Sequence, residues 1–154
     1  MKNGALTMTE QQEIVPIRVG ELVGEAARLY AEGHRLVQIS CTTLESAYEL
    51  SYSFDKGYRL QHLRVTVTQE EEIPSISIIY PGAFLYENEI HDLFGLTVRN
   101  IAVDYRGTLY RTKVQTPFSI ENCPVPVPPK PKQEAPKETG EAESPEEQRE
   151  GSGE

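Results

Sequence analysis

Alternating apolar and polar residues predict a β-strand over residues 47–54, in which Tyr48, Leu50, Tyr52 and Phe54 share one face. One apolar and one polar face are typical of an antiparallel strand that is buried on one side. Asp55-Lys56-Gly57 predicts a tight turn, after which residues 58–67 return as the hairpin partner. The apolar phase shifts between Leu60 and Leu63 of that partner, which predicts a β-bulge near His62.

Shorter apolar runs predict the remaining strands. Residues 34–41 are expected to form the strand before the hairpin, and residues 14–17 a short extended entry. After an exposed turn at residues 70–74, the alternation of Ile76, Ile78 and Tyr80 predicts a third meander strand.

Helical spacing appears in two places. Residues 21–32 predict a helix with the apolar positions Leu22, Val23, Ala26, Leu29 and Tyr30, and Gly33 is placed for a left-handed cap. Residues 82–94 predict a second helix that ends at Gly95, with the apolar positions Ala83, Tyr86, Ile90 and Leu93. The predicted fold is α+β, a two-layer domain in which an antiparallel meander sheet carries helices on one face.

Composition divides the 154 residues into four parts. Residues 1–12 are predicted to be a flexible N-terminus, 13–98 the α+β domain, 99–123 an extended interaction arm, and 124–154 a disordered tail rich in Pro and Glu. The formal net charge of −9, without a basic stripe, excludes nucleic acid as an expected partner.

The sequence also bears on the compartment. The first thirteen residues lack the apolar core of a signal peptide, and no run approaches the roughly 20 apolar residues that span a bilayer, so a cytoplasmic chain is expected. Cys41 and Cys123 lie far apart, which fits a reducing compartment and does not suggest an iron–sulfur cluster.

Three interpretations compete for the acidic helix at residues 82–94. Glu87 and His91 lie four residues apart, while Glu89 and Asp92 lie three apart, and ordinary solvation with favourable helix-end charges would explain them. Glu-x-x-x-His can place two metal ligands one turn apart, but a third ligand is missing nearby. Acid–base catalysis is weakly indicated, since no nucleophile in a recognisable order accompanies the carboxylates.

The third interpretation is a protein interface. The segment after the helix carries the Tyr and Arg side chains that often anchor protein–protein contacts. These residues are Arg99, Tyr105, Arg106, Tyr110, Arg111 and Phe118. We therefore expect an arm that lies over another surface and gains order from a partner.

One motif resembles a known family. Tyr86, Glu87, Glu89, Ile90, Asp92, Leu93, Phe94, Gly95 and Leu96 follow in order the signature of the C-type (30 kDa) subunit of respiratory complex I, the NADH dehydrogenase, and of its hydrogenase counterparts. The resemblance covers residues 13 to about 120. The complex I members usually carry Arg where this chain has Asn88, and continue into a His-Pro-x-Leu-Arg-Arg-like segment that is absent here. The Asn-Glu-Ile-His-Asp-Leu-Phe-Gly run at residues 88–95, followed by Asp-Tyr-x-Gly-x-x-Tyr at residues 104–110, looks more like the D-type small subunit of energy-converting membrane-bound [NiFe] hydrogenases.

The resemblance implies a non-catalytic subunit without a cofactor of its own. [NiFe] and iron–sulfur clusters are expected in partner subunits. The implied partners are the nickel–iron hydrogenase large subunit or its D-like counterpart in complex I, an iron–sulfur small subunit and, indirectly, membrane subunits. The chain would dock beside the large subunit on the cytoplasmic side of the membrane. The whole complex would link ferredoxin oxidation to hydrogen evolution and to proton or sodium translocation. A component of a quinone-linked dehydrogenase and an unrelated soluble binding module stay open as alternatives.

The resemblance also implies roles for residues. Glu87, Glu89 and Asp92 would pair with partner arginines, and His91, on the flank of Glu87, would belong to the same interface. Phe94 and Gly95 would let the helix end pack closely against its neighbour. Tyr105, Arg106, Tyr110 and Arg111 would anchor the arm. Replacing Glu87 and Glu89 by Lys should then leave the isolated domain folded and abolish assembly.

Overall fold

The computed structural model describes residues 12–123, and the predicted flexible N-terminus and disordered tail lie outside this range except for Gln12. The main sheet has four strands in the order β1-β4-β3-β2. They are β1 (Gln12–Ile17), β2 (Arg35–Thr43), β3 (Tyr48–Lys56) and β4 (Arg59–Val67). β2, β3 and β4 form the predicted antiparallel meander, and β1 pairs with β4 in parallel.

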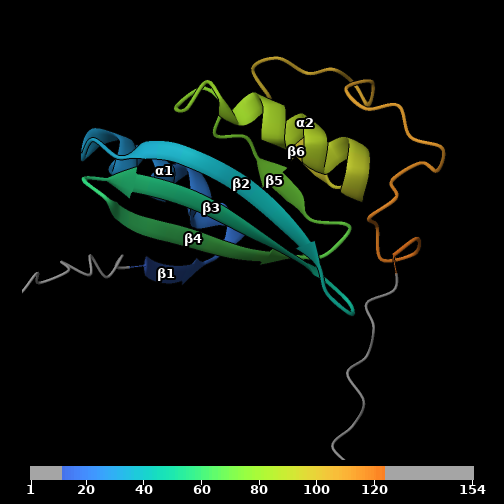
Figure 1. Ribbon diagram of the computed structural model, residues 1–154, viewed down its shortest axis with the longest axis horizontal. Helices are drawn as coiled ribbons and strands as arrows, with labels where there is room; N and C mark the ends of the chain where they lie inside the picture. Colours follow the sequence, from blue (N-terminus) through green and yellow to red (C-terminus); the bar gives the residue numbers. More distant parts are fainter. Residues whose placement is uncertain (1–11, 124–154) are drawn as a thin grey trace, which may run out of the picture.

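Two α-helices cover the sheet. A 3-10 turn, Val19–Glu21, leads into α1 (Leu22–Ala31), and α2 (Ala83–Phe94) follows later in the chain. In Figure 1, α1 lies behind the sheet and α2 lies above it, beside β2. Buried residues of both helices join one core with the apolar side of β3, so the prediction of an α+β domain with helices on one face is confirmed.

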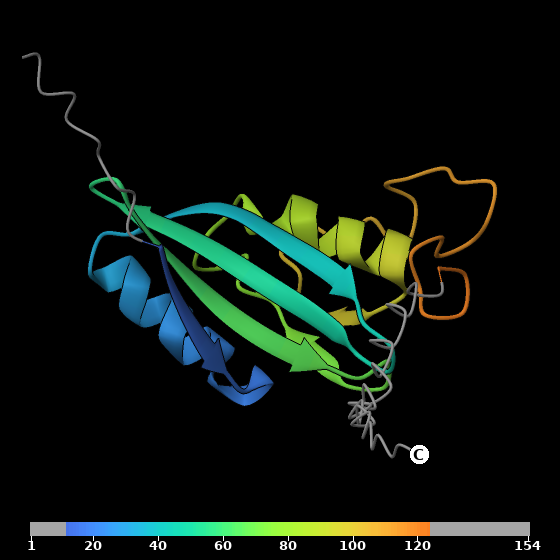
Figure 2. The same cartoon turned by 60° about the horizontal axis from the view of Figure 1, so that its bottom comes forward.

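The core contains the four side chains that the alternation of β3 predicted, whereas Val23 and Tyr30 of the predicted apolar face of α1 are exposed. Tyr48, Leu50, Tyr52 and Phe54 are essentially buried, together with Leu63, Val65 and Val67 of β4 and Leu22, Ala26 and Leu29 of α1. Figure 2 shows the long twisted strands of the hairpin running beside both helices. Burial of these aromatic and aliphatic side chains is the main stabilising term of the domain.

The predicted third meander strand is wrong. Ile76 and Tyr80 are buried, but Ile78 between them is 85% exposed. The backbone N–H groups of Ile79 and Tyr80 both donate to the Ile76 carbonyl, so the segment turns instead of extending. The strand lies earlier, where β5 (Glu72–Pro74) pairs in parallel with β6 (Thr97–Arg99), in place of the predicted exposed turn.

The predicted bulge near His62 is also wrong. The register of β3 with β4 continues without a shift through the Ser53 and His62 pair. The imidazole of His62 lies 2.9 Å from the Ser53 hydroxyl on the polar side of the sheet. The irregularity falls between β2 and β3, at Leu36 and Gln38.

Glycines close both helices as predicted. Gly33 after α1 has φ +86° and Gly95 after α2 has φ +76°, a left-handed conformation that side chains disfavour. Within residues 12–123, no helix has the length and apolar character to cross a membrane.

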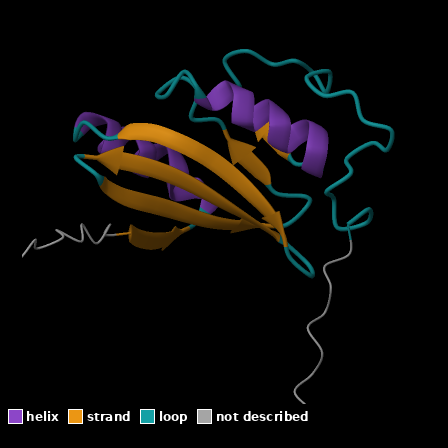
Figure 3. Cartoon of the chain, viewed as in Figure 1, coloured by secondary structure: helices purple, strands orange, loops and turns teal. Residues whose placement is uncertain are grey.

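From Asn100 to Cys123 the chain forms neither helix nor strand. Figure 3 shows this segment as a loop that passes α2 and curls around its C-terminal end. We refer to residues 99–123, which begin at the last residue of β6, as the arm.

Candidate functional site: the acidic helix and its arm

The carboxylate of Glu87 lies inside the protein. The residue is 1% exposed, although it belongs to the polar flank that the sequence places at a surface. One oxygen accepts a hydrogen bond from the Ser75 hydroxyl at 2.6 Å, and the other accepts one from the backbone N–H of Ile76 at 2.8 Å. α2 is thereby fastened to the loop that precedes it.

This contact continues into the arm. Because the Ser75 hydroxyl donates to Glu87, it accepts from Ser77, whose hydroxyl lies 2.6 Å away. The Ser77 hydroxyl in turn accepts from the backbone N–H of Ala102 at 2.8 Å. A directed chain of hydrogen bonds therefore runs from Ala102 in the arm to the buried carboxylate, which we call the serine relay.

Burial raises the pKa of Glu87 above its ordinary range, because the charged form loses solvation. The hydrogen bonds from the Ser75 hydroxyl and the Ile76 amide act in the opposite direction by stabilising the carboxylate. Burial is the larger influence, so the folded protein holds the Glu87 proton more tightly than the unfolded chain does.

Asn88 clamps the arm to α2. It is fully buried, and its Nδ2 donates to the carbonyls of Phe84 at 2.7 Å and Val103 at 2.8 Å. Its Oδ1 accepts from the backbone N–H of Tyr105 at 2.7 Å. The sequence marked Asn88 only as a departure from the complex I pattern. No periodicity or motif in the sequence pointed to an amide that faces the arm.

Glu89 and Asp92 also face the arm. Tyr110 donates its backbone N–H to Asp92 at 2.9 Å and its hydroxyl to Glu89 at 3.1 Å. The hydrogen bond to Glu89 raises the pKa of the Tyr110 hydroxyl, since ionisation would place two negative charges together. The predicted polar flank therefore contacts the chain's own arm.

The C-terminal end of α2 is closed by the same segment. Phe94 packs edge-on against Tyr48 and also contacts Phe118, with ring centroids 6.2 and 5.5 Å apart. A Cβ on Gly95 would approach the methyl group of Thr116 to 3.0 Å, so the close packing predicted for this glycine occurs within the chain. His91 Nδ1 lies 3.1 Å from the Leu96 carbonyl.

The remaining predicted interface residues lie at the surface. Tyr105, Arg106 and Arg111 are exposed in the arm, and the Tyr105 ring lies 6.4 Å from that of Phe84. Arg106 adopts φ +52° and its N–H donates to Asp104, which fixes a tight turn before Gly107. Their contact with a partner stays a prediction.

Two expectations therefore change. The arm lies over a surface as expected, but that surface is α2 of the same chain, which orders the arm without a partner. Glu87 is engaged by Ser75 and Ile76 in the interior, so a direct pairing with a partner arginine is contradicted by its burial.

Over residues 12–123, no three His, Cys, Asp or Glu side chains gather in a way that could hold a metal ion.

Substitutions of Glu87 and Glu89 by Lys should differ in their effect on the stability of the chain. We expect Glu87→Lys to lower the free energy of unfolding by about 3–5 kcal/mol, because it buries an unpaired charge. Glu89→Lys is the matched control and should cost about 1 kcal/mol or less, because Glu89 is partly exposed and loses one hydrogen bond. Urea unfolding of the isolated chain measures both. Equal stability of the two variants would contradict the burial of Glu87.

The raised pKa of Glu87 predicts a pH dependence of stability. The pKa of Glu87 is higher in the folded protein than in the unfolded chain. The stability that Glu87 contributes is therefore fully present below the unfolded pKa and is lost as the pH rises through the folded pKa. The free energy of unfolding of the wild type, minus that of Glu87→Gln, should therefore fall from pH 4 toward neutrality, as urea titrations can measure. The same titrations on Glu121→Gln, at an exposed position, control for the substitution itself.

Asn88 should control the attachment of the arm. Asn88→Ala removes the partners of Val103 and Tyr105, and we expect a loss of about 1–3 kcal/mol with faster hydrogen exchange at the Tyr105 amide. Asn122→Ala is the control, because Asn122 bonds the arm only near its end, at the carbonyls of Gln115 and Thr116. Unchanged protection of the Tyr105 amide in Asn88→Ala would refute the clamp.

Comparison with known proteins agrees with the signature on α2. Residues 17–120 match the family described as respiratory-chain NADH dehydrogenase, 30 Kd subunit. The C subunit of NADH-quinone oxidoreductase from Jannaschia sp. (strain CCS1) is 35% identical over 66 residues, which are 38% of this chain and 32% of that protein. Its counterpart from Chelativorans sp. (strain BNC1) is 36% identical over 69 residues, or 40% of this chain and 34% of that protein. The chain thus spans about a third of the length of the curated relatives it matches.

A solved structure shares the fold. A chain in the structure of the membrane-bound sulfane sulfur reductase, an archaeal respiratory membrane complex, superimposes with a TM-score of 0.63 at 16% identity. The match covers 77% of this chain and 76% of that chain. The family match extends from the end of β1 through α2 and most of the arm, and includes the signature residues described above. This chain belongs to the family of the 30 kDa subunit of respiratory-chain NADH dehydrogenase, which is the C-type subunit of complex I.

Proposed function

We propose that this chain is a cofactor-free accessory subunit of a membrane-bound respiratory complex, docked against the large subunit of that complex. The observation that carries the proposal is that polar side chains of α2 hold the arm and the preceding loop of the same chain in place. The loop before α2 is bound by Glu87, and the arm is bound by Asn88 and Asp92. These contacts fix the path of the arm over the surface of α2. A rigid surface with exposed Tyr and Arg side chains suits docking.

The comparisons support a component of a larger assembly. The relatives are named as the C subunit of NADH-quinone oxidoreductase, and the structural neighbour belongs to an archaeal respiratory membrane complex. The structural match covers about three-quarters of this chain and about three-quarters of the archaeal chain, so the two chains are similar in length. The curated relatives are much longer than the matched region.

Within this class, we favour an ion-translocating [NiFe] hydrogenase that takes electrons from ferredoxin and evolves hydrogen. The support is the run from Asn88 to Gly95 and the arm after it, which resemble the short hydrogenase-type subunits. The nickel–iron and iron–sulfur groups would belong to the large and small partner subunits, and the chain would sit peripherally on the cytoplasmic face. Membrane subunits would be reached indirectly.

A corresponding role in a quinone-linked dehydrogenase is the second candidate. The identities of 35% and 36% to NADH-quinone oxidoreductase components favour it. The two candidates predict the same docking surface and differ in the metal content and activity of the assembly.

The exposed arginines of the arm provide the test. We expect tagged wild-type chain, purified from its native membranes in mild detergent, to bring a large subunit with it. Charge reversal by Arg106→Glu with Arg111→Glu should abolish this co-purification. Both positions are exposed, and the introduced carboxylates would repel the acidic groups of the partner that the arginines contact. Mass spectrometry identifies the partners, while nickel, iron and hydrogen-evolution assays on the same fraction identify the chemistry.

A matched control reverses two charges elsewhere. Lys56→Glu with Arg59→Glu changes the exposed end of the β3–β4 hairpin and should leave the assembly intact. Nickel with hydrogen evolution supports the hydrogenase, and quinone-reductase partners without nickel support the second candidate. Recovery of the wild-type chain alone would overturn the accessory role.

A further inference from the structure

A groove lies where the end of α1, the start of β2 and the first half of α2 meet. Its volume is about 780 Å³, which is typical of a ligand-binding cleft. The apolar and aromatic side chains that line it include Tyr30, Val37, Tyr80, Leu85, Tyr86 and Tyr110. Tyr30 is 59% exposed, Leu85 48% and Tyr110 45%, so the groove presents apolar area to solvent.

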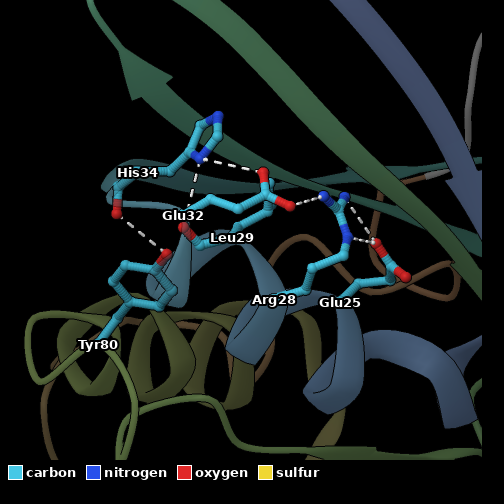
Figure 4. A network of polar contacts seen from close by, with 6 residues as sticks. All are labelled: Glu25, Arg28, Leu29, Glu32, His34 and Tyr80. Atoms are coloured by element: carbon cyan, nitrogen blue, oxygen red, sulfur yellow. Dashed lines mark hydrogen bonds and ion pairs between the residues drawn. The ribbon is translucent and has the colours of Figure 1, made fainter.

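Two tyrosine hydroxyls close the sheet edge that borders the groove. β2 is an edge strand of the main sheet. Figure 4 shows the Tyr80 hydroxyl directed at the carbonyl of His34, just before β2, and the Tyr86 hydroxyl donates to the Val37 carbonyl at 3.3 Å. Because these carbonyls already have donors, they are not offered to an added β-strand. The groove therefore suits a ligand that inserts side chains.

The wall formed by α2 changes from apolar to acidic along its length. Leu85, Tyr86 and Glu89 lie on one stripe of the helix, because they are three and four residues apart. Between the N-cap of α2 and Glu89 the helix rises about 10 Å. At the apolar end, Tyr30 and Tyr80 pack edge to face with ring centroids 5.4 Å apart. The carboxylate stands at the other end.

The acidic end carries a charge that the chain does not compensate. Arg35 also lines the groove, but its guanidinium is engaged by Asp55 at 2.9 Å. Glu32, beside the groove, pairs with Arg28 at 2.6 Å. Among residues 12–123, Glu89 forms no ion pair with any Lys, Arg or His. A ligand that brings a cation to this end would therefore complement the groove.

An arginine side chain has the chemistry that fits the acidic end. One oxygen of Glu89 accepts a hydrogen bond from the Tyr110 hydroxyl at 3.1 Å, and a guanidinium can donate to the other oxygen. A guanidinium also stacks on aromatic rings, which Tyr86 and Tyr110 supply on either side of Glu89 in the groove lining. A lysine ammonium has no plane with which to stack, so arginine is the better complement.

We propose that this groove receives an arginine and a neighbouring apolar side chain from the large subunit of the complex, with the arginine bound at Glu89 and the apolar side chain beside Leu85 and Tyr30. The inference rests on the docking proposed above and names the chemistry of the partner segment. At the exposed arm this chain supplies the cations of the interface, whereas at the groove it supplies the anion.

Photo-crosslinking in the intact complex tests what fills the groove. Leu85→p-benzoylphenylalanine places a photoreactive ring at an exposed groove position. Leu44→p-benzoylphenylalanine is the matched control, since Leu44 is exposed beyond the opposite end of β2. On irradiation of native membranes, we expect the Leu85 variant to join a peptide of the large subunit that contains arginine. The Leu44 variant should give no such product.

Glu89→Gln separates the charge of the groove from its shape. The amide oxygen can still accept from Tyr110, so the arm keeps this contact. We expect the large subunit to dissociate from the immobilised chain about tenfold faster in mild detergent, because a hydrogen bond to a charged group becomes a neutral one. Glu45→Gln, at an exposed position after β2, should leave the dissociation rate unchanged.

The outcomes distinguish the groove from the docking itself. If the wild-type chain retains the large subunit, either a missing Leu85 crosslink to it or an unchanged dissociation rate of Glu89→Gln would overturn the groove inference and leave the accessory role intact. Crosslinking of the Leu85 variant to lipid, to a second copy of this chain or to a segment without arginine would overturn the inference as well. Loss of the large subunit from the wild-type chain would overturn the docking on which it rests.

Discussion

Burial of the Glu87 carboxylate is the constraint on which the arrangement around α2 depends. An ionised side chain inside a protein is costly unless hydrogen bonds satisfy it, so the loop before α2 must present Ser75 and the Ile76 amide to it. That requirement fixes the turn at Ile76–Tyr80, which in turn directs Tyr80 into the core beside Phe54. The same serines reach Ala102, so one buried charge orders the chain on both sides of the helix.

The sequence predicted those elements that periodicity alone determines. The β3–β4 hairpin, α1, α2 and the two terminal glycines appear close to their expected positions, because local pattern and burial agree there. Ile76–Tyr80 misled the prediction, since its alternation imitates a strand while a buried carboxylate takes up the Ile76 amide. The pairing of β1 with β4 and of β5 with β6 depends on distant partners that no local pattern reveals.

The sequence identified the residues of the candidate site but did not predict what each of them contacts. The family signature identified α2, and the interface interpretation assigned the following segment to a partner surface, whereas it lies on α2 of the same chain. It also assigned Glu87 to the interface because an isolated helix with one apolar stripe suggests a solvated acidic flank. In the folded chain α2 is enclosed by the sheet, the preceding loop and the arm, so a second side of the helix becomes buried. Asn88 shows the same effect.

The attachment of the arm has a consequence for sequence variation. α2 holds the arm through its peptide groups, because Asn88 and Asp92 bind the backbone of Val103, Tyr105 and Tyr110. Side chains along the arm can therefore change without loosening these anchor points. Relatives could alter what the arm recognises while its path stays constant, much as antibody loops diversify upon an invariant framework.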